Sequence, residues 1–152
     1  YDLGVYCSSL ILRMLGKEPE KIQAVSSFSG ENVDMYTMVL MEYENGLRAS
    51  FDCGMVLATE KHSALDRFQI HGTKGSVQGV KFGFNAPGEL SYLVKTFEGR
   101  EELKTVSVPQ NYRLEVEQLG RCITEGETPA VSEAFSLANA RIIDEILKCI
   151  GY

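Results

Sequence analysis

Two stretches of alternating character, separated by the dipeptide Asn45-Gly46, constrain the fold more than any other feature of this sequence. Residues 33–43 and 47–55 each have the length and composition of a β-strand. In the second stretch, one set of alternate side chains is mainly apolar and the other is polar. The first set is Leu47, Ala49, Phe51, Cys53 and Met55, and the second is Arg48, Ser50 and Asp52. Because Asn-Gly is the strongest short signal for a hairpin, we expect two antiparallel strands joined by a tight turn.

Five more stretches have the length and composition of strands, and turn residues separate them. They are residues 21–28, 67–71, 76–80, 89–97 and 101–108. The turn residues include GTKG at 72–75 and FNAPG at 84–88. A Gly-x-x-Gly loop also occurs in RNA-binding KH modules, but there it lies between helices, so a β-turn is the favoured interpretation here. The short links favour antiparallel pairing of neighbouring strands.

Helical periodicity is found at both ends of the chain. Residues 5–15 are expected to form a helix that ends at Gly16. A second helix has one apolar face and ends at Gly126; the face consists of Tyr112, Val116, Leu119 and Ile123. A third is expected to begin at the N-cap Ser132, and its apolar stripe consists of Phe135, Ala138, Ile142, Ile146 and Ile150. The sequence therefore predicts an α+β fold, with one open, mainly antiparallel sheet and all three helices packed on one face.

Composition excludes several classes of function. The formal net charge is -6, and the 15 Lys and Arg residues are scattered and outnumbered by 21 Asp and Glu residues, which argues against a nucleic-acid partner. Apolar runs are shorter than the ~20 residues that a membrane span needs. The four cysteines, Cys7, Cys53, Cys122 and Cys149, have no metal-ligand spacing. We expect reduced, mostly buried thiols, no metal and a cytoplasmic location.

Asp2 and Tyr6 form the one pair whose residue types and spacing suggest chemistry. They stand four residues apart where the first helix begins, so both lie on the same side of that helix. Asp2 could instead be the N-cap of the helix, and Tyr6 could be a half-buried aromatic anchor. As a catalytic pair they would exchange a proton with a substrate. A free phenol keeps its proton up to about pH 10, so it would need a neighbouring cation to act at neutral pH.

Five segments, in order along the chain, resemble one known family. They are DLGVYC at 2–7, LGKEP at 15–19, FQIHGTKGS at 68–76, NYRLEVEQLGRCITEGETP at 111–129 and FSLANARIIDEI at 135–146. The strand pair around Asn45-Gly46 fits the same pattern. Together they resemble the C-terminal domain of the Gfo/Idh/MocA oxidoreductases, which include glucose-fructose oxidoreductase, inositol dehydrogenase and dihydrodiol dehydrogenase. The resemblance covers nearly the whole chain.

This resemblance implies an enzyme of two parts. In the family, an N-terminal Rossmann domain binds NAD or NADP and supplies the lysine of a Glu-Lys-Pro motif to the active site. Residues 1–152 resemble the other part, the C-terminal substrate-binding and dimerisation domain. Neither a P-loop nor a Gly-x-Gly-x-x-Gly fingerprint occurs in them, so the chain alone is expected to bind no NAD(P) and to be inactive.

For the full-length protein, the resemblance implies hydride transfer between the nicotinamide and the CH–OH group of a sugar, polyol or dihydrodiol. The family's Asp and the His or Tyr four residues later match Asp2 and Tyr6. Tyr6 would take or give the hydroxyl proton, and Asp2 would orient the substrate or the tyrosine. Asp34, Arg67 and Tyr112 are candidate substrate contacts.

A different class of function also fits the sequence. The alternating strands leave a sheet face of mixed polarity, with Arg48, Ser50, Asp52 and Lys104, that could serve a non-catalytic binding or assembly domain. Members of the resembling family associate through this face, so a homodimer or a dimer of dimers is expected in either case. The sequence upstream of Tyr1 would discriminate, because a Rossmann pattern there would support the enzyme.

Overall fold

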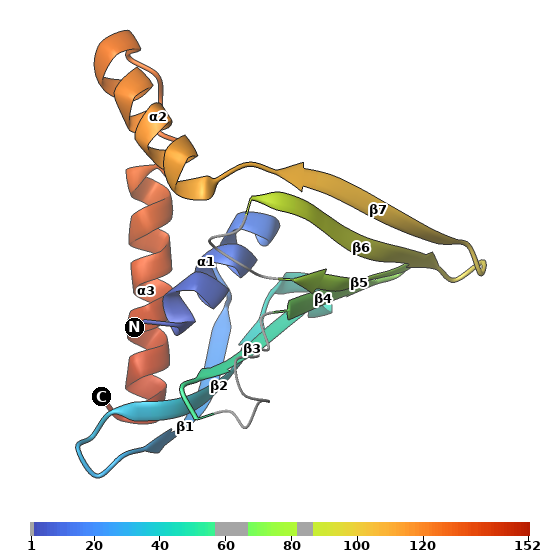
Figure 1. The fold of residues 1–152 in the computed structure, drawn as a ribbon. Helices are drawn as coiled ribbons and strands as arrows, with labels where there is room; N and C mark the ends of the chain where they lie inside the picture. The colour runs from blue at the N-terminus through green and yellow to red at the C-terminus, as the bar shows by residue number, and fades with distance from the viewer. Residues whose placement is uncertain (1, 57–66, 82–86) are drawn as a thin grey trace. The chain divides into compact units, whose positions relative to one another are not determined.

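The computed structural model describes residues 2–56, 67–81 and 87–152 of the chain (Figure 1). The chain divides into two compact units. The first unit contains residues 1–58 and 130–152, and the second unit contains residues 59–129. The turn expected at 84–88 lies largely outside the described residues.

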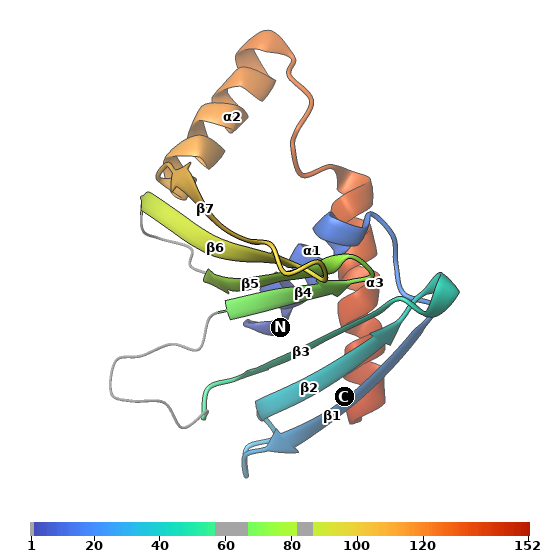
Figure 2. The ribbon, with the colours of Figure 1, turned by 90° about the vertical axis from the view of Figure 1, so that its right-hand side faces the viewer.

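Three antiparallel strands form the sheet of the first unit, and Figure 2 shows them side by side. They are β1 (Lys21–Phe28), β2 (Asp34–Glu42) and β3 (Arg48–Gly54), with β2 in the middle. A short 3-10 turn, η1 (Glu44–Gly46), links β2 to β3. Asn45 and Gly46 have φ values of 60° and 75° there, the left-handed conformation that such a turn requires. The predicted hairpin is confirmed.

Two helices belong to the first unit, α1 (Gly4–Leu15) and α3 (Glu133–Ile150). As predicted, Gly16 ends α1 in a left-handed conformation, and the Ser132 hydroxyl caps α3 by accepting a hydrogen bond from the Phe135 N–H. The interpretation of Asp2 as an N-cap is wrong. Leu3 occupies that position with helical backbone angles, and no side chain caps α1. Capping requires an extended residue directly before the helix, and Asp2 stands one residue too early.

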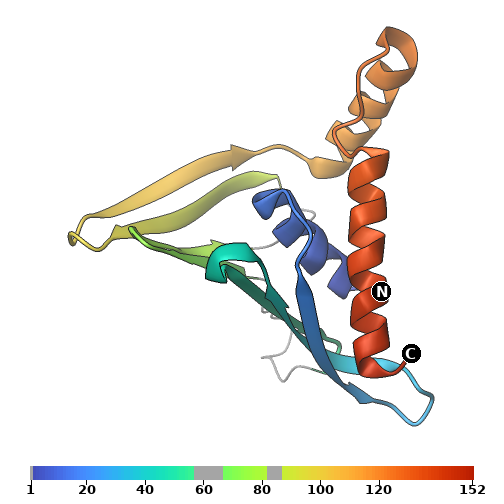
Figure 3. The same ribbon diagram turned by 180° about the vertical axis from the view of Figure 1, so that it is seen from behind.

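Both helices cover the same face of the three-stranded sheet, as Figure 3 shows. Helix α3 contacts β1, and α1 contacts β3 and α3. The apolar core between them consists of Ile11, Leu12, Val39, Met41, Tyr43, Ala138, Ile142, Ile143 and Ile146. Val39 and Met41 stand two apart on β2, so alternation turns both toward the helices. Helix-on-sheet packing is therefore confirmed for α1 and α3.

A buried polar contact joins α1 to α3 within this core. The Ser8 hydroxyl is fully buried and donates a hydrogen bond of 2.7 Å to Asn139 Oδ1. The Asn139 amide donates in turn to the carbonyl oxygen of Val5, at 3.3 Å. Because a buried polar group without its partner costs about 1–3 kcal/mol, the contact fixes α1 at one position along α3. Helix α1 carries Tyr6 in its first turn, and Asp2 lies in the chain that leads into it.

The second unit contains a four-stranded antiparallel sheet and one helix. The elements are β4 (Arg67–Gly72), β5 (Gly75–Lys81), β6 (Gly88–Thr96), β7 (Glu101–Val108) and α2 (Asn111–Glu125). The strands pair in sequence order. The α+β class with antiparallel strands is confirmed, but the described strands form two hydrogen-bonded sheets instead of one. Tight turns force neighbouring strands to pair, whereas the link between β3 and β4, residues 55–66, is far longer than a hairpin turn.

Helix α2 has no buried residue. The apolar face expected to pack is exposed, with relative exposures of 53% for Tyr112, 70% for Val116, 61% for Leu119 and 74% for Ile123. Its predicted end at Gly126 is confirmed, in a left-handed conformation with φ of 70°. The periodicity therefore predicted the helix and its limits correctly, and α2 differs from α1 and α3 in contributing nothing to a core.

The cysteines correct one expectation. All four are free thiols, but Cys7, Cys53 and Cys122 are half-buried and Cys149 is exposed, so the expectation of mostly buried thiols is wrong. Cys149 stands in the last turn of α3, where its thiol lies 3.5 Å from the carbonyl oxygen of Ile22. Cys122 lies on α2, a helix without buried residues.

Candidate functional site

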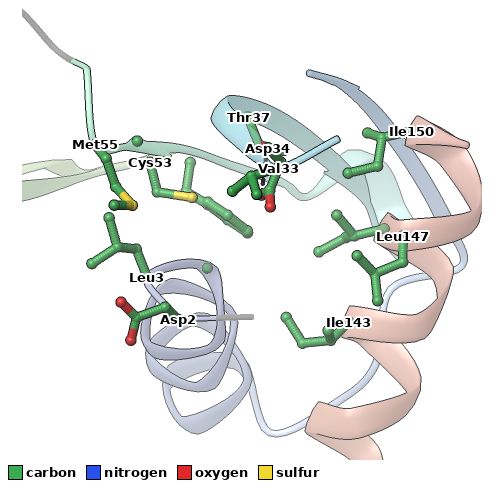
Figure 4. A pocket seen from close by; sticks show the side chains of 14 residues that line it. Asp2, Leu3, Val33, Asp34, Thr37, Cys53, Met55, Ile143, Leu147 and Ile150 are labelled. Carbon is green, nitrogen blue, oxygen red and sulfur yellow. Dashed lines mark hydrogen bonds between the residues drawn. The ribbon is translucent and has the colours of Figure 1, made fainter. Parts of the chain in front are cut away.

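A pocket of about 130 Å³ lies in the first unit, between the start of α1, neighbouring parts of β2 and β3, and the C-terminal half of α3 (Figure 4). Most of its wall is apolar. The apolar and small residues are Leu3, Gly4, Val33, Phe51, Gly54, Met55, Ile143, Ile146, Leu147 and Ile150. The others are Asp2, Asp34, Thr37 and Cys53. The lining thus combines a hydrocarbon surface with a few polar groups, as small-molecule sites do, in a volume below the ~300–1,000 Å³ of pockets for drug-sized ligands.

Two of the residues predicted for the site, Asp2 and Asp34, line this pocket together. Asp2 comes from the chain entering α1 and is exposed, whereas Asp34 begins β2 and is half-buried. The residues that line the pocket include no Lys, Arg or His among those described. Carboxylates accept hydrogen bonds and repel anions. Such a pocket suits a ligand with hydroxyl groups better than a phosphate or a carboxylate.

The hydroxyl group of Thr37 contacts the Asp34 carboxylate, and a second hydroxyl group, that of Ser26, contacts Thr37. The Thr37 hydroxyl lies 3.3 Å from Asp34 Oδ2, and the Ser26 hydroxyl lies 2.8 Å from that of Thr37. Thr37 is only 4% exposed, whereas Asp34 reaches the pocket. The carboxylate is therefore anchored at its buried side and open on the other.

Cys53 lies between the start of α1 and Asp34. A methyl group added at Gly4 would stand 3.6 Å from its sulfur, which shows how closely the thiol approaches the helix. Burial raises the pKa of the Cys53 thiol to about 11, and the nearby Cys7 and Asp34 act in the same direction. Because the thiolate is the reactive form of cysteine, Cys53 is a neutral part of the pocket wall at pH 7 and not a nucleophile.

The other predicted site residues are distributed differently. Tyr6 lies on α1 with 45% of its surface exposed, and it is not among the residues that line the pocket. Arg67, in β4, is exposed, and Tyr112, in α2, is 53% exposed; both belong to the second unit. Of the five predicted residues, the structure therefore brings Asp2 and Asp34 into one pocket, and Tyr6 lies on α1, whose first residue, Gly4, lines that pocket.

The described residues do not fit the phosphates of a nicotinamide cofactor. Phosphates in such sites accept hydrogen bonds from free N–H groups at the start of a helix. At α2 the Gln110 side chain already accepts from the Arg113 N–H, and at α3 Ser132 takes the corresponding place. At α1 the neighbouring Asp2 would repel a phosphate. In the described part of the chain, no three His, Cys, Asp or Glu side chains are grouped so that they could hold a metal ion.

Comparison with known sequences identifies the class of protein. A family model described as "GFO/IDH/MocA C-terminal domain" matches residues 1–78, just over half of the 152 residues. The chain belongs to the Gfo/Idh/MocA oxidoreductase family. The predicted membership is confirmed.

The curated relatives of the chain include several dehydrogenases. Trans-1,2-dihydrobenzene-1,2-diol dehydrogenase from Mus musculus is 31% identical over 99% of this chain and 45% of its own length. D-xylose 1-dehydrogenase (NADP(+)) 2 from Haloferax volcanii is 27% identical over 95% of this chain and 43% of its own length. The chain therefore spans somewhat less than half the length of these relatives.

Solved structures confirm the fold. KijD10, a 3-ketoreductase from Actinomadura kijaniata solved with NADP and TDP-benzene, is 18% identical with a TM-score of 0.84, covering 98% of this chain and 45% of that chain. The protein yvaA from Bacillus subtilis is 22% identical with a TM-score of 0.74, covering 98% of this chain and 49% of that chain. At these identities the likeness shows the fold alone. Among the described residues, no helix is long and apolar enough to span a membrane.

Sequence reasoning missed Thr37, Cys53 and the α3 side chains that face the pocket. Cys53 could have been predicted as a site residue, because the alternation of β3 places it on the same side as Phe51. Thr37 could not have been predicted, because strict alternation along β2 would place it on the opposite face of the sheet from Asp34. The α3 residues were assigned only to the core stripe, yet Ile146 and Ile150 also line the pocket.

Proposed function

We propose that residues 1–152 are the substrate-binding half of an NAD(P)-dependent oxidoreductase that acts on a CH–OH group of a sugar, polyol or dihydrodiol. The main support for this proposal is the pocket, which is lined by the carboxylates of Asp2 and Asp34 and by a mostly apolar wall. Carboxylates accept hydrogen bonds from substrate hydroxyl groups, and apolar side chains contact the carbon skeleton. The dehydrogenases among the relatives support this class of reaction.

In this proposal the cofactor is held by another part of the protein. The half-length coverage of the relatives is consistent with such a part, and the described residues offer no phosphate site. The chain by itself is then inactive. A cytoplasmic location belongs to the same proposal and is supported by four free cysteines.

Within this chain, Tyr6 is the proposed acid or base for the substrate hydroxyl and Asp2 orients the substrate. Tyr6→Phe in the full-length enzyme keeps the ring but removes its exchangeable proton. We expect kcat to fall by about 100-fold or more, the usual share of general acid-base catalysis. The free energy of unfolding should change by at most ~1 kcal/mol, because this side chain is 45% exposed.

Steady-state kinetics and a thermal melt test this prediction. Tyr92→Phe, in β6 of the second unit, is the matched control and should leave kcat unchanged. A Tyr6→Phe enzyme with nearly normal kcat and reduced stability would identify Tyr6 as an aromatic anchor, and the catalytic acid would then have to lie elsewhere.

Assembly through the outer face of the three-stranded sheet is a second proposed function, and it is compatible with the first. On this face, opposite Val39 and Met41, the apolar side chains Val25, Met38 and Leu40 are exposed by 67%, 50% and 38%. Val25 and Met38 are direct cross-strand neighbours. A second copy of the chain would cover these side chains and form a homodimer.

Light scattering over a range of protein concentrations tests the dimer. The wild-type protein should have the mass of a dimer, and Met38→Glu should shift it toward the monomer, because burying a carboxylate among apolar side chains is unfavourable. Val116→Glu adds the same charge at an exposed position on α2 and should leave the mass unchanged. A wild-type protein that stays monomeric at high concentration would exclude this interface.

A further inference from the structure

A β-bulge determines where Asp34 points. Along β1 and β2 the paired residues run in regular order to Ser27 and Tyr36, but the next pair is Phe28 and Asp34, so Met35 is an extra residue on β2. One extra residue reverses the alternation of side chains beyond it. Asp34 therefore lies on the helix-covered side of the sheet with Thr37, and both line the pocket with Ile143 of α3.

The neighbouring strand accommodates this bulge closely. Gly54 of β3 pairs with Tyr36. A Cβ atom at Gly54 would stand 2.6 Å from the Met35 carbonyl oxygen and 2.9 Å from Tyr36 Cα. The strands on both sides of β2 thus accommodate the bulge. The bulged backbone places the Asp34 carboxylate next to the Thr37 hydroxyl.

Proton counting gives the hydroxyl groups a direction. A carboxylate can only accept, so Thr37 donates its single proton to Asp34 across 3.3 Å. The 2.8 Å contact between Ser26 and Thr37 then needs the proton of Ser26. The Ser26 hydroxyl also donates to the Tyr36 carbonyl oxygen, at 3.0 Å, so it shares its single proton between these two acceptors. Thr37 is thus the hydroxyl that donates to Asp34, and Ser26 contacts Thr37 in turn.

We propose that Thr37 is a positioning residue, which fixes the Asp34 carboxylate so that its free lone pairs accept hydrogen bonds from substrate hydroxyl groups. This inference rests on the proposed function, in which Asp34 contacts the substrate. Because Thr37 is 4% exposed and its hydroxyl is engaged with Asp34 and Ser26, it acts through Asp34 and not on the substrate itself. A preorganised acceptor binds more tightly than one that must be ordered on binding.

Kinetics of the full-length enzyme with its neutral hydroxylated substrate test the proposal. Thr37→Val keeps the β-branched shape and removes the hydroxyl, and Ser26 can then donate to the Tyr36 carbonyl, so no buried donor is left unpaired. We expect KM to rise about tenfold with kcat nearly unchanged, the effect of losing one hydrogen bond to a charged group. Thr37→Ser restores the hydroxyl and should recover most of the lost affinity.

A double-mutant cycle with Asp34→Asn separates this inference from the proposed function. If Thr37 acts through Asp34, Asp34→Asn raises KM and adding Thr37→Val raises it no further. A normal KM in Thr37→Val, or additive effects in the double mutant, would overturn the positioning role while leaving Asp34 as a substrate contact. A normal KM in Asp34→Asn would overturn both the substrate role of Asp34 and the inference.

Discussion

The first and second units are built from the same kinds of element, yet they bury their apolar side chains very differently. In the first unit, two helices and three strands enclose a core in which Met41 is completely inaccessible and Ile142 is 2% exposed. In the second unit, no described residue between 67 and 129 is buried, and apolar side chains such as Leu103 and Ile123 are at least 70% exposed.

The difference concerns the geometry of packing, because both units have amphipathic elements. Helices α1 and α3 lie across one sheet face and are tied together by Ser8 and Asn139. Helix α2 has a comparable apolar stripe but buries none of it. Since burial of apolar area is the main stabilising term, the stability of the first unit should come from its core, whereas that of the second unit should depend on strand pairing and local helix preference.

Paired isoleucine substitutions test this contrast most strongly. Ile142→Ala in α3 removes a side chain that is 2% exposed, and it should lower the free energy of unfolding by about 2–5 kcal/mol. Ile123→Ala makes the same change in α2 at a side chain that is 74% exposed, and it should cost no more than about 0.5 kcal/mol. Urea denaturation of both variants gives the two values. Equal losses would mean that Ile123 is covered in solution, and the contrast would then disappear.

The sequence predicted those features that depend on local chemistry. The Asn45-Gly46 hairpin, the caps at Gly16, Gly126 and Ser132, and the limits of all seven strands agree with the structure to within one or two residues. Each depends on a residue with a strong backbone preference or on a simple period.

The features that could not be predicted depend on how one element pairs with or packs against another. The bulge at Met35 arises from the pairing of β1 and β2, so no alternation pattern in β2 alone reveals it. For the same reason Thr37 was missed, although Asp34 was selected. The amphipathic period of α2 predicts a helix with an apolar face but says nothing about what covers that face. Burial is decided by tertiary contacts, and the period contains no information about them.

Two glycine substitutions, one in each unit, test the same contrast with smaller expected changes in the free energy of unfolding. Gly54→Ala in the first unit would place a methyl group against the Met35 carbonyl, and it should destabilise by about 1–3 kcal/mol, the range for overpacking. Gly120→Ala in α2 adds a methyl group that meets no described atom within 4 Å, and it should stabilise by about 0.5–1 kcal/mol through helix propensity. Thermal melts measure both. A destabilised Gly120→Ala variant would show that α2 packs closely at this point.

Two exposed ion pairs, one in each unit, provide the test with the smallest expected effect, because exposed ion pairs contribute little to stability. In the first unit, Arg141 on α3 donates two hydrogen bonds to Glu18, of 3.0 and 2.6 Å, across 123 positions of sequence. This contact lowers the pKa of Glu18 below its ordinary value of 4.5. In the second unit, Arg121 lowers the pKa of Glu127 in the same way, but the two residues are only six apart. A contact between distant segments opposes unfolding more than a local one.

A lowered carboxyl pKa stabilises the folded state above the unfolded pKa, and this contribution is lost as the pH falls through the folded pKa. Glu18→Gln should therefore lower stability at pH 7, by less than about 1 kcal/mol because the Glu18 side chain is 40% exposed and screened by solvent. The difference from wild type should vanish as the pH falls below 4.5 and through the lowered pKa of folded Glu18, and it should shrink in 1 M salt, where the Debye length is only about 3 Å. Glu127→Gln should change the urea midpoint less than Glu18→Gln does. A Glu18→Gln deficit that grows on acidification would contradict this assignment, because it would require a carboxyl group whose folded pKa is raised.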